Sequence, residues 1–331
     1  MLFIRRYSSP RLFESVSVKL TIDGPDEMIC GYIELAQVGN KILKILHTVV
    51  TPVYRGGNIG RRLIEKAIEY AQMNNAKLLS SCSYATHLLL KEKNVNILAK
   101  ASDLEHELKL NPATERTAFL EKLLNIQPGG YGEGDLIIPC TIPDLRQKEQ
   151  LWGPFSKPLL EDLLKSRTHD LRMLALIAMT EMYKRSTKTP DVRKELFNIY
   201  TKQIEGVNNW DLVDISAPWI VGDYSFENNE AQEKIESYII SKDLWIRRIG
   251  IVSTLGQIRK GKTEMALKAV KESLDYPHHL IQKANGWMLR EVGKNNKEML
   301  ITFLNKYREK IPSITFNYAT EHLDKETKKL L

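Results

Sequence analysis

The sequence predicts two domains of different fold, an N-terminal α/β domain and a C-terminal all-α region of helix pairs stacked in series. The length of 331 residues exceeds what one compact core usually spans. Short β-rich stretches alternate with turns up to about residue 100, and amphipathic helical patterns then follow one another almost without interruption. All five tryptophans lie beyond residue 150, so the two parts also differ in composition.

The N-terminal part has the pattern β-β-β-turn-α-β-α. Its first three strands are VSVKLTI, MICGYIELA and KILKILHTVV, separated by turn signals at 23–25 and 39–40. A glycine-rich turn, YRGGNIG, leads into RRLIEKAIEYAQMN, a helix with one apolar face made of Leu63, Ala67, Tyr70 and Ala71. Lys77 to Cys82 predicts a further strand and Tyr84 to Lys91 a short helix. These elements predict an α/β domain over residues 13–100.

The remaining sequence, residues 105–331, is typical of a helical solenoid. LRMLALIAMTEMY (171–183) places Leu171, Leu174, Ala175, Ala178 and Met182 on one helical face. Similar helical segments are expected near 114–125, 157–165, 190–205, 230–240, 242–258, 278–293, 296–309 and 313–323. Because the connections are short, we expect a solenoid of HEAT-like repeats with a concave face.

Charge is distributed unevenly along the chain. The formal net charge is +7. Residues 1–100 contain 14 Lys and Arg against 8 Asp and Glu, whereas residues 101–241 contain 16 Lys and Arg against 23 Asp and Glu. Residues 242–310 carry the largest basic excess, 15 against 7. This segment predicts a surface for an acidic partner, so a concave face rich in basic residues is expected.

Several protein classes are excluded or disfavoured. No apolar run approaches the roughly 18–20 residues that cross a bilayer, so we expect no membrane span. Cys30, Cys82 and Cys140 lie far apart without a CxxC pair, which argues against a disulfide scaffold or a metal site and suits a reducing compartment. We expect a monomer in the cytoplasm or nucleus. Residues 1–12 begin with MLFIRRYSS, which is basic and contains no acidic residue. This composition fits two alternatives, a mitochondrial targeting segment and a basic, disordered terminus.

Three helical segments combine tryptophan with charge. GVNNWDLVDISAPWIVGDY (206–224) places Trp210 and Asp214 four residues apart on one face, LWIRRIGIV (244–252) puts two arginines in an apolar helix, and KANGWMLREVGK (283–294) contains Trp287. Taken singly, each segment also fits core tryptophans with a capping or paired aspartate. Together with GGYGEGDLIIPCTIPDLRQ (129–147), they resemble the DNA alkylation repair glycosylase family over residues 105–331.

The resemblance implies a function in the repair of alkylated DNA. Members of that family are HEAT-like solenoids that bind duplex DNA and release purines alkylated at N7 or N3 by acting on the sugar. It implies that Asp214 is the catalytic carboxylate, that Trp210 and Trp287 contact the deoxyribose, and that Arg248 holds the DNA backbone. No cofactor or metal is implied. Further DNA contacts are expected from the neighbouring residues Trp245, Arg247, Arg259, Lys260, Lys262 and Arg290.

These residue types suit the chemistry. An alkylated purine is already cationic, so its glycosidic bond breaks without protonation of the leaving base. The protein must stabilise positive charge on the sugar, which a carboxylate does by Coulomb attraction in a site from which water is excluded. The face of each aromatic ring that contacts the cationic sugar adds roughly 0.5–2 kcal/mol of attraction.

The segment 47–90 resembles the small GCN5-related N-acetyltransferases, over residues 13–95. The resemblance implies that the turn Arg55-Gly56-Gly57-Asn58-Ile59-Gly60 offers N–H groups to the pyrophosphate of acetyl-CoA, and that His47 and Cys82 belong to an acetyl-transfer site with an unknown amine acceptor. Asn58 replaces an expected glycine, although asparagine tolerates left-handed backbone. Val49 replaces the acid of that family's pattern.

Three functions therefore remain open from the sequence. The first is a DNA glycosylase fused to an acetyltransferase-like domain. The second is a helical module that binds nucleic acid or protein without catalysis. The third is an acetyl-CoA-dependent N-acetyltransferase in which the solenoid serves as the targeting domain. The presence of Trp210, Asp214, Arg248 and Trp287 favours the first.

Overall fold

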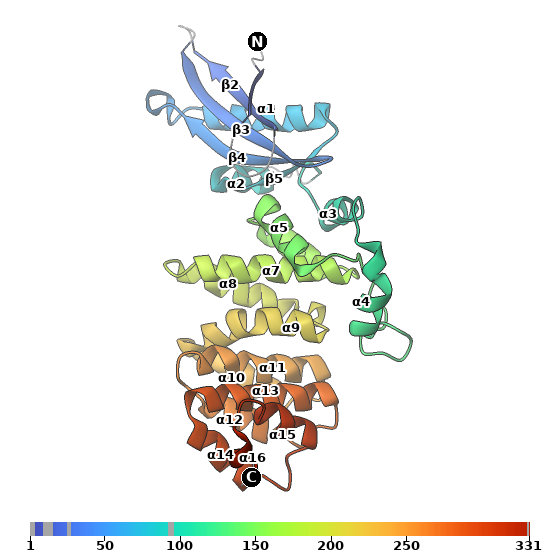
Figure 1. The fold of residues 1–331 in the computed structure, drawn as a ribbon. Coiled ribbons are helices and arrows are strands. Elements are labelled where there is room, and N and C mark those ends of the chain that lie inside the picture. The colour runs from blue at the N-terminus through green and yellow to red at the C-terminus, as the bar shows by residue number, and fades with distance from the viewer. Residues whose placement is uncertain (1–3, 9–15, 25–27, 92–95, 330) are drawn as a thin grey trace. The chain divides into compact units, whose positions relative to one another are not determined.

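The structure is a computed structural model that describes residues 4–8, 16–24, 28–91, 96–329 and 331 (Figure 1). Of the proposed targeting segment 1–12, only residues 4–8 are described, and they form a β-strand; the rest lies outside the described residues. Contacts divide the chain into two compact units, Met1–Leu123 with Gly134–Ala178 and Leu124–Glu133 with Met179–Leu331. Among the described residues, no helix is both long and apolar enough to span a bilayer.

A five-stranded sheet forms the core of the first unit, in the order β1-β2-β3-β4-β5. The first four strands pair antiparallel and β5 pairs parallel with β4, because helix α1 (Ile59–Met73) crosses between them. Leu63, Ala67 and Ala71 are buried on α1, which confirms its predicted face, and Tyr70 packs at the edge of that core. The other elements are β1 (Ile4–Ser8), β2 (Val16–Asp23), β3 (Ile29–Gly39), β4 (Ile42–Val50), β5 (Lys77–Ser80) and α2 (Ser83–Lys91).

The first helices beyond residue 100 are anchored on this sheet. The buried indole of Trp152 donates to the Val38 carbonyl oxygen at 2.9 Å. Lys44 donates to the carbonyl oxygens of Leu151 and Gly153, and the Glu107 carboxylate accepts from two backbone N–H groups of the β3–β4 turn. These bonds satisfy polar groups that burial would otherwise penalise. Helices α3 (Ala101–Leu108) and α5 (Ile142–Trp152) therefore belong to the same compact unit as the sheet.

The rest of the chain is helical, as predicted. The helices are α3 (Ala101–Leu108), α4 (Thr117–Leu123), α5 (Ile142–Trp152), α6 (Lys157–Leu164), α7 (His169–Arg185), α8 (Pro190–Lys202), α9 (Trp210–Ala217), α10 (Asn229–Ile239), α11 (Leu244–Ile258), α12 (Glu264–Lys271), α13 (His279–Asn295), α14 (Lys297–Lys306), α15 (Ser313–Ala319) and α16 (Lys325–Lys329). Helices α3, α5, α12 and α16 have no counterpart among the predicted segments. Three of these four have eight residues or fewer, so each offers few turns in which an apolar period can show.

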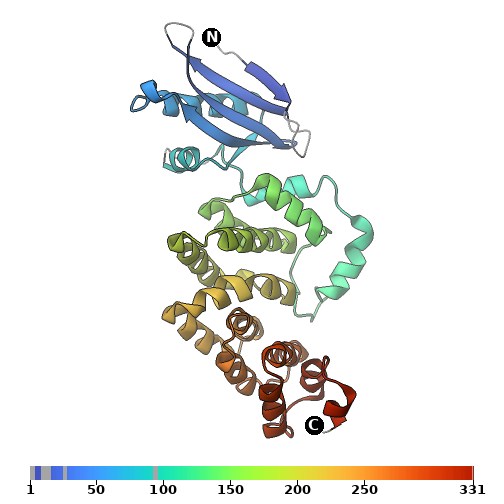
Figure 2. The same cartoon turned by 60° about the vertical axis from the view of Figure 1, so that its left-hand side comes forward.

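Helices of the second unit pack in sequence order (Figure 2). Helix α11 packs against α9 and α13, and α13 packs against α15, while α10 and α12 also pack on α11. A π-helical turn, Pro218–Asp223, fits against α11 where Gly222 meets Gly256. A Cβ on Gly222 would lie 1.9 Å from the Ser253 carbonyl oxygen, so this close approach requires glycine. The row α9, α11, α13 carries the predicted catalytic residues.

Candidate functional site

Helix α9 presents Trp210 and Asp214 from its first two turns. Asn209 caps the helix by accepting from the Trp210 N–H at 2.8 Å, and its amide donates to the Leu124 carbonyl oxygen at 3.0 Å. Asn209 is fully buried, so this cap also ties the 124–133 segment to the start of α9. The sequence predicts the shared face of Trp210 and Asp214 but not this anchor.

Asp214 is held by Arg248 from α11. The Arg248 Nη2 donates to Oδ1 and Oδ2 of Asp214 at 2.9 and 2.8 Å, and Nε donates to Oδ1 at 3.1 Å. The third nitrogen, Nη1, donates to the Leu280 carbonyl oxygen. The side chain of Arg248 is 5% exposed and that of Asp214 is 23% exposed. Arg248 thus fixes the carboxylate from within the protein, and only Asp214 keeps a face open to solvent.

Burial and pairing act on Asp214 in opposite directions. Burial raises the pKa of this carboxyl above its ordinary value, and the Arg248 guanidinium opposes that rise. Because both Asp214 oxygens accept from one fork of donors, the orientation of the carboxylate is set before any ligand arrives. The site therefore combines a fixed anion with partly excluded water.

Tyr131 joins this cluster; the sequence marked its segment, 129–147, but not this residue. The Trp210 indole N–H donates to the Tyr131 hydroxyl, and burial raises the pKa of Tyr131. Its ring meets the Trp245 ring edge to face at 5.5 Å between centroids. Tyr131 lies in the GGYGEGD segment, within the loop that Asn209 anchors. Only the position of that loop beside α9 and α11 shows its relation to Asp214.

A second aromatic pair, His278 and His279, lies at the start of α13. The two imidazoles stack at 4.7 Å between centroids, and His278 meets the Tyr131 ring at 6.2 Å. Burial lowers the pKa of both histidines, with further lowering from the neighbouring positive charge of Arg248. Trp287 lies two turns further along α13 and is half-buried.

The predicted DNA-contacting residues fall in separate places. Trp245 joins the Tyr131 cluster, whereas Arg247 donates to the Ser241 and Glu272 carbonyl oxygens and lies over the Tyr276 ring. Arg290 on α13 pairs with Glu291 and Glu321. Arg248 and Arg247 are adjacent in sequence, but consecutive helical positions point about 100° apart, so they meet different partners.

The basic residues Arg259, Lys260 and Lys262 follow the other end of α11. Arg259, the C-cap, lies about 16 Å from Arg248 along the helix axis at 1.5 Å per residue. Arg259 lies over the Trp219 ring at 4.6 Å, and both lysines lie 4.5 Å from the centroid of the Phe226 ring. Lys260 also pairs with Asp223 at 2.9 Å. These cations form a basic, aromatic-backed surface that is separate from the immediate surroundings of Asp214.

In the first unit, the predicted cofactor turn borders a cavity of about 510 Å³. Its lining consists of Thr48, Val49, Val50, Arg55, Gly56, Gly57, Gly60 and Tyr84. Gly56 has a φ of +86° and supplies the left-handed residue of the turn. Asn58 has a φ of −82° and is the N-cap of α1. The expectation that Asn58 must tolerate left-handed backbone is therefore wrong, because Gly56 makes the reversal.

The predicted acetyl-transfer residues lie apart from the lining of this cavity. His47 is exposed on β4, directly before Thr48, and is not among the residues that line the cavity. Cys82 follows β5 and donates its backbone N–H to the Ser80 hydroxyl. Within the described part of the chain, the buried Thr48 Oγ1 has no hydrogen-bond partner. The cavity lining among those residues supplies hydroxyls and Arg55 but neither carboxylate nor imidazole.

Residues 104–323 match the family model described as DNA alkylation repair enzyme, which is about two-thirds of the chain. The chain belongs to this DNA alkylation repair enzyme family. Residues 19–98 match the GCN5-related N-acetyltransferase family and form a domain of that type. Both resemblances stated from the sequence are thereby confirmed.

A comparison with solved structures concerns the fold. A protein from Enterococcus faecalis, described as a predicted DNA alkylation repair enzyme, aligns in structure with a TM-score of 0.52 at 15% sequence identity. The alignment covers 65% of this chain and 98% of that chain. At this identity the likeness supports the fold alone. No curated protein matches the chain.

Proposed function

We propose that this member of the DNA alkylation repair enzyme family is a DNA N-glycosylase that releases purines alkylated at N7 or N3 from duplex DNA. The observation that carries the proposal is the Asp214 carboxylate, which two Arg248 nitrogens hold about one helical turn from Trp210. The Trp210 indole in turn donates to the Tyr131 hydroxyl, whose ring meets that of Trp245. Membership of the family and the basic excess of residues 242–310 support DNA as the partner.

The arrangement suits stabilisation of a cationic sugar. As the bond to a positively charged base breaks, positive charge develops on the deoxyribose, and a fixed carboxylate attracts it without reorganising. The open face of Asp214 is where the sugar or the attacking water would approach. The indoles of Trp210 and Trp287 are assigned to the sides of the deoxyribose, where their faces favour a cation.

Arg248 takes a different role in this proposal from the one that the resemblance implies. Its nitrogens already donate to Asp214 and to the Leu280 carbonyl oxygen, and its side chain is buried. We assign it as a positioning residue that orients Asp214 and keeps it ionised. Contacts to DNA phosphates are assigned to the more exposed cations Arg259, Lys260 and Lys262.

Replacing Asp214 with asparagine tests the proposal. Asp214→Asn keeps the size of the side chain but removes the negative charge, so release of 7-methylguanine or 3-methyladenine from methylated duplex DNA should fall roughly 100-fold or more. Single-turnover base release measures the rate, and fluorescence anisotropy on the same duplex measures binding. Binding should change little, because the phosphate-contacting cations remain.

Asp211→Asn is the matched control, since it removes the same charge from the same helix. Asp211 accepts from the Leu212 N–H at 2.8 Å in the first turn of α9. Its replacement should leave base release within a few-fold of the parent rate. Equal rates for Asp214→Asn and the parent chain would refute the catalytic carboxylate, and binding without release by the parent would favour the non-catalytic module.

A second candidate function, acetyl-CoA binding, rests on the cavity beside Gly56. The N-terminus of α1 directs backbone N–H groups at the turn, Gly56 permits the reversal, and the Thr48 Oγ1 is a buried polar atom without a protein partner among the described residues. These features fit a pyrophosphate at the turn and an acyl-pantetheine chain along β4. Acetyl-CoA would supply the activated acetyl group. Arg55, Gly56, Gly57 and Gly60 would bind and orient it.

A further inference from the structure

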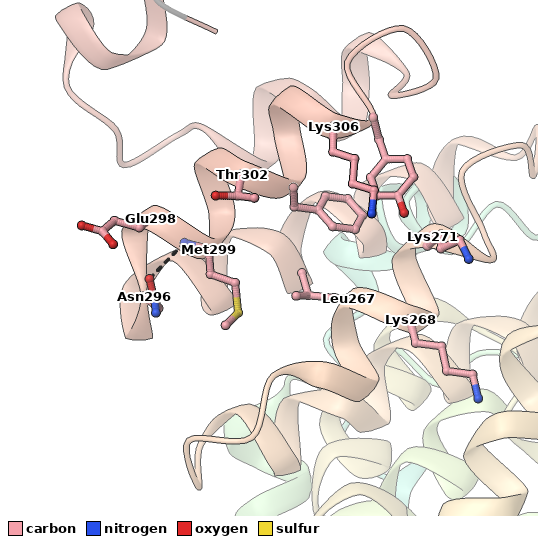
Figure 3. A pocket seen from close by; sticks show the side chains of 10 residues that line it. Leu267, Lys268, Lys271, Asn296, Glu298, Met299, Thr302 and Lys306 are labelled. Atoms are coloured by element: carbon pink, nitrogen blue, oxygen red, sulfur yellow. Dashed lines mark hydrogen bonds between the residues drawn. The ribbon is translucent and has the colours of Figure 1, made fainter.

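The second unit contains a groove that the proposed glycosylase function does not use. It has a volume of about 610 Å³ and lies between α12 and α14 (Figure 3). The proposed catalytic residues lie on α9, α11 and α13 instead. Its lining consists of Leu267, Lys268, Lys271, Asn296, Glu298, Met299, Thr302, Phe303, Lys306 and Tyr307.

The two helices meet at their N-terminal ends and leave the groove along the rest of their length. The Thr263 hydroxyl, which precedes α12, donates to the Met299 sulfur in the first turn of α14 at 3.1 Å. Both helices pack on α13, which forms the layer beneath them. The lining residues then continue to Lys271 at the end of α12 and to Lys306 at the end of α14.

The floor of the groove is apolar and partly exposed. Leu267, Met299 and Tyr307 are half-buried, and Phe303 is 7% exposed. Apolar side chains gathered in an open groove favour an apolar occupant, because covering them removes their surface from water. The volume lies within the range of about 300–1,000 Å³ that is typical of ligand sites.

Charge is polarised along the groove. Lys268, Lys271 and Lys306 lie at one end, whereas Asn296 and Glu298 lie at the other (Figure 3). Lys268 pairs with Glu236 at 2.7 Å, but both side chains are about half exposed, and such pairs contribute little and exchange readily. Lys271 and Glu272 are 3.7 Å apart on the surface, and Lys306 lies over the Tyr307 ring. The lysine end is therefore available to an acidic partner.

We propose that this groove binds an acidic helical segment of a partner protein, with one bulky apolar side chain on the Met299–Phe303 floor and carboxylates at the lysine end. Helix-in-groove binding uses apolar anchors at spacings of three and four residues, which suits a groove bounded by two helices. Charge complementarity selects an acidic rather than a basic segment. A nucleic acid would match the lysines but not the apolar floor.

The test measures binding of designed peptides to the full-length chain. The probe is a fluorescein-labelled helix of about 14 residues with leucine at positions i, i+3, i+4 and i+7 and glutamate elsewhere. Control peptides replace every glutamate with lysine, or every leucine with serine. The Glu/Leu peptide should bind saturably, and each control should bind at least about tenfold more weakly.

Variants then locate the site. Lys271→Glu/Lys306→Glu should weaken binding of the Glu/Leu peptide at least about tenfold. Lys194→Glu/Lys234→Glu, on the exposed surfaces of α8 and α10, makes the same charge change elsewhere and should leave affinity unchanged. Leu267→Gln makes the floor polar and should weaken binding without altering the net charge, with circular dichroism confirming the fold of each variant.

Three results would overturn the proposal. Equal binding of the Glu/Leu and Lys/Leu peptides would show that charge does not select the occupant. An unchanged affinity of Lys271→Glu/Lys306→Glu would place the peptide elsewhere. Displacement of the bound peptide by undamaged duplex DNA, with loss of DNA binding in the same variant, would assign the groove to DNA. None of these results depends on whether the chain releases bases.

Discussion

The Asp214 site and the Gly56 cavity differ in what holds their functional groups. At Asp214, the carboxylate is fixed by a buried arginine, and the neighbouring rings come from three separate segments. The Gly56 cavity is instead lined mainly by one continuous turn before α1 and by the end of β4. The first site depends on distant partners and the second on local backbone conformation.

In the N-terminal domain, two departures from the family pattern have different consequences. Asn58 departs from the expected glycine, yet its φ of −82° is ordinary, so the turn forms without it. At Val49 the expected acid is absent, and the described lining of the cavity contains no carboxylate. A backbone site tolerates side-chain changes, whereas acid–base chemistry does not. Ligand binding and acetyl transfer are therefore separable expectations for this domain.

The largest expected effect comes from removing Arg248. Arg248→Met leaves Asp214 partly buried without its charged partner, and breaking such a pair typically lowers the free energy of unfolding by about 3–5 kcal/mol. Urea denaturation followed by circular dichroism measures the change. Arg248→Lys keeps the positive charge but not the two-nitrogen contact, so its free energy of unfolding should fall by less than that of Arg248→Met. A loss below about 1 kcal/mol for Arg248→Met would mean that Asp214 does not depend on its partner.

The pH dependence of base release also tests whether Arg248 controls the ionisation of Asp214. Burial raises the pKa of Asp214, so its charge is lost at a higher pH than for an exposed aspartate, and release should fall about tenfold per unit below that pKa. In Arg248→Met the pKa should rise further, because the opposing positive charge is gone. The acid limb of single-turnover rates, corrected for spontaneous base loss, should therefore move to higher pH.

The histidine pair provides the control for this pH dependence. Burial lowers the pKa of His278 and His279, so both imidazoles stay neutral until the pH is below their ordinary value. His278→Asn/His279→Gln keeps an N-cap on α13 and removes both titrating groups. The acid limb should stay in place; a shift in this double variant would assign it to the histidines.

A smaller effect is expected at the N-terminal turn. Gly56→Ala forces a Cβ into a φ of +86° and should lower the free energy of unfolding by about 1–2 kcal/mol and weaken acetyl-CoA binding. Gly57→Ala is the matched control, because its Cβ would lie 3.7 Å from the Tyr54 carbonyl oxygen, an ordinary contact. Calorimetric titration measures binding. A flat trace for the parent chain up to millimolar acetyl-CoA would leave this domain without the proposed ligand.

The smallest expected effect is at Tyr131. Tyr131→Phe keeps the ring against Trp245 but removes the hydroxyl that accepts from Trp210, a change of about 1 kcal/mol, or roughly fivefold in base release. Tyr131→Ala also removes the ring and should cost more. If Tyr131→Phe and Tyr131→Ala have equal rates, the ring does not support the site.

Local sequence patterns were sufficient to predict most helices and strands and to locate the motifs. The alternation in residues 16–50 predicts strands that the structure confirms as β2, β3 and β4. The four-residue spacing correctly placed Trp210 and Asp214 on one helix, α9. The sequence did not predict which helices pack with the sheet. Helices α3 and α5 join it through hydrogen bonds between residues that are distant in sequence, such as that from Trp152 to Val38. The roles of the predicted catalytic, DNA-contacting and acetyl-transfer residues stay predictions.

The sequence by itself determined most element types, the apolar face of α1, the tryptophan and aspartate that share a face of α9, and the glycine-rich turn, because each depends on spacing within one segment. Only the tertiary structure decided that Arg248 holds Asp214, that Tyr131 and His278 join the same cluster, and that α12 and α14 leave a lysine-ended groove. These features join residues that are far apart along the chain. Their contacts depend on how helices pack, which no single segment specifies.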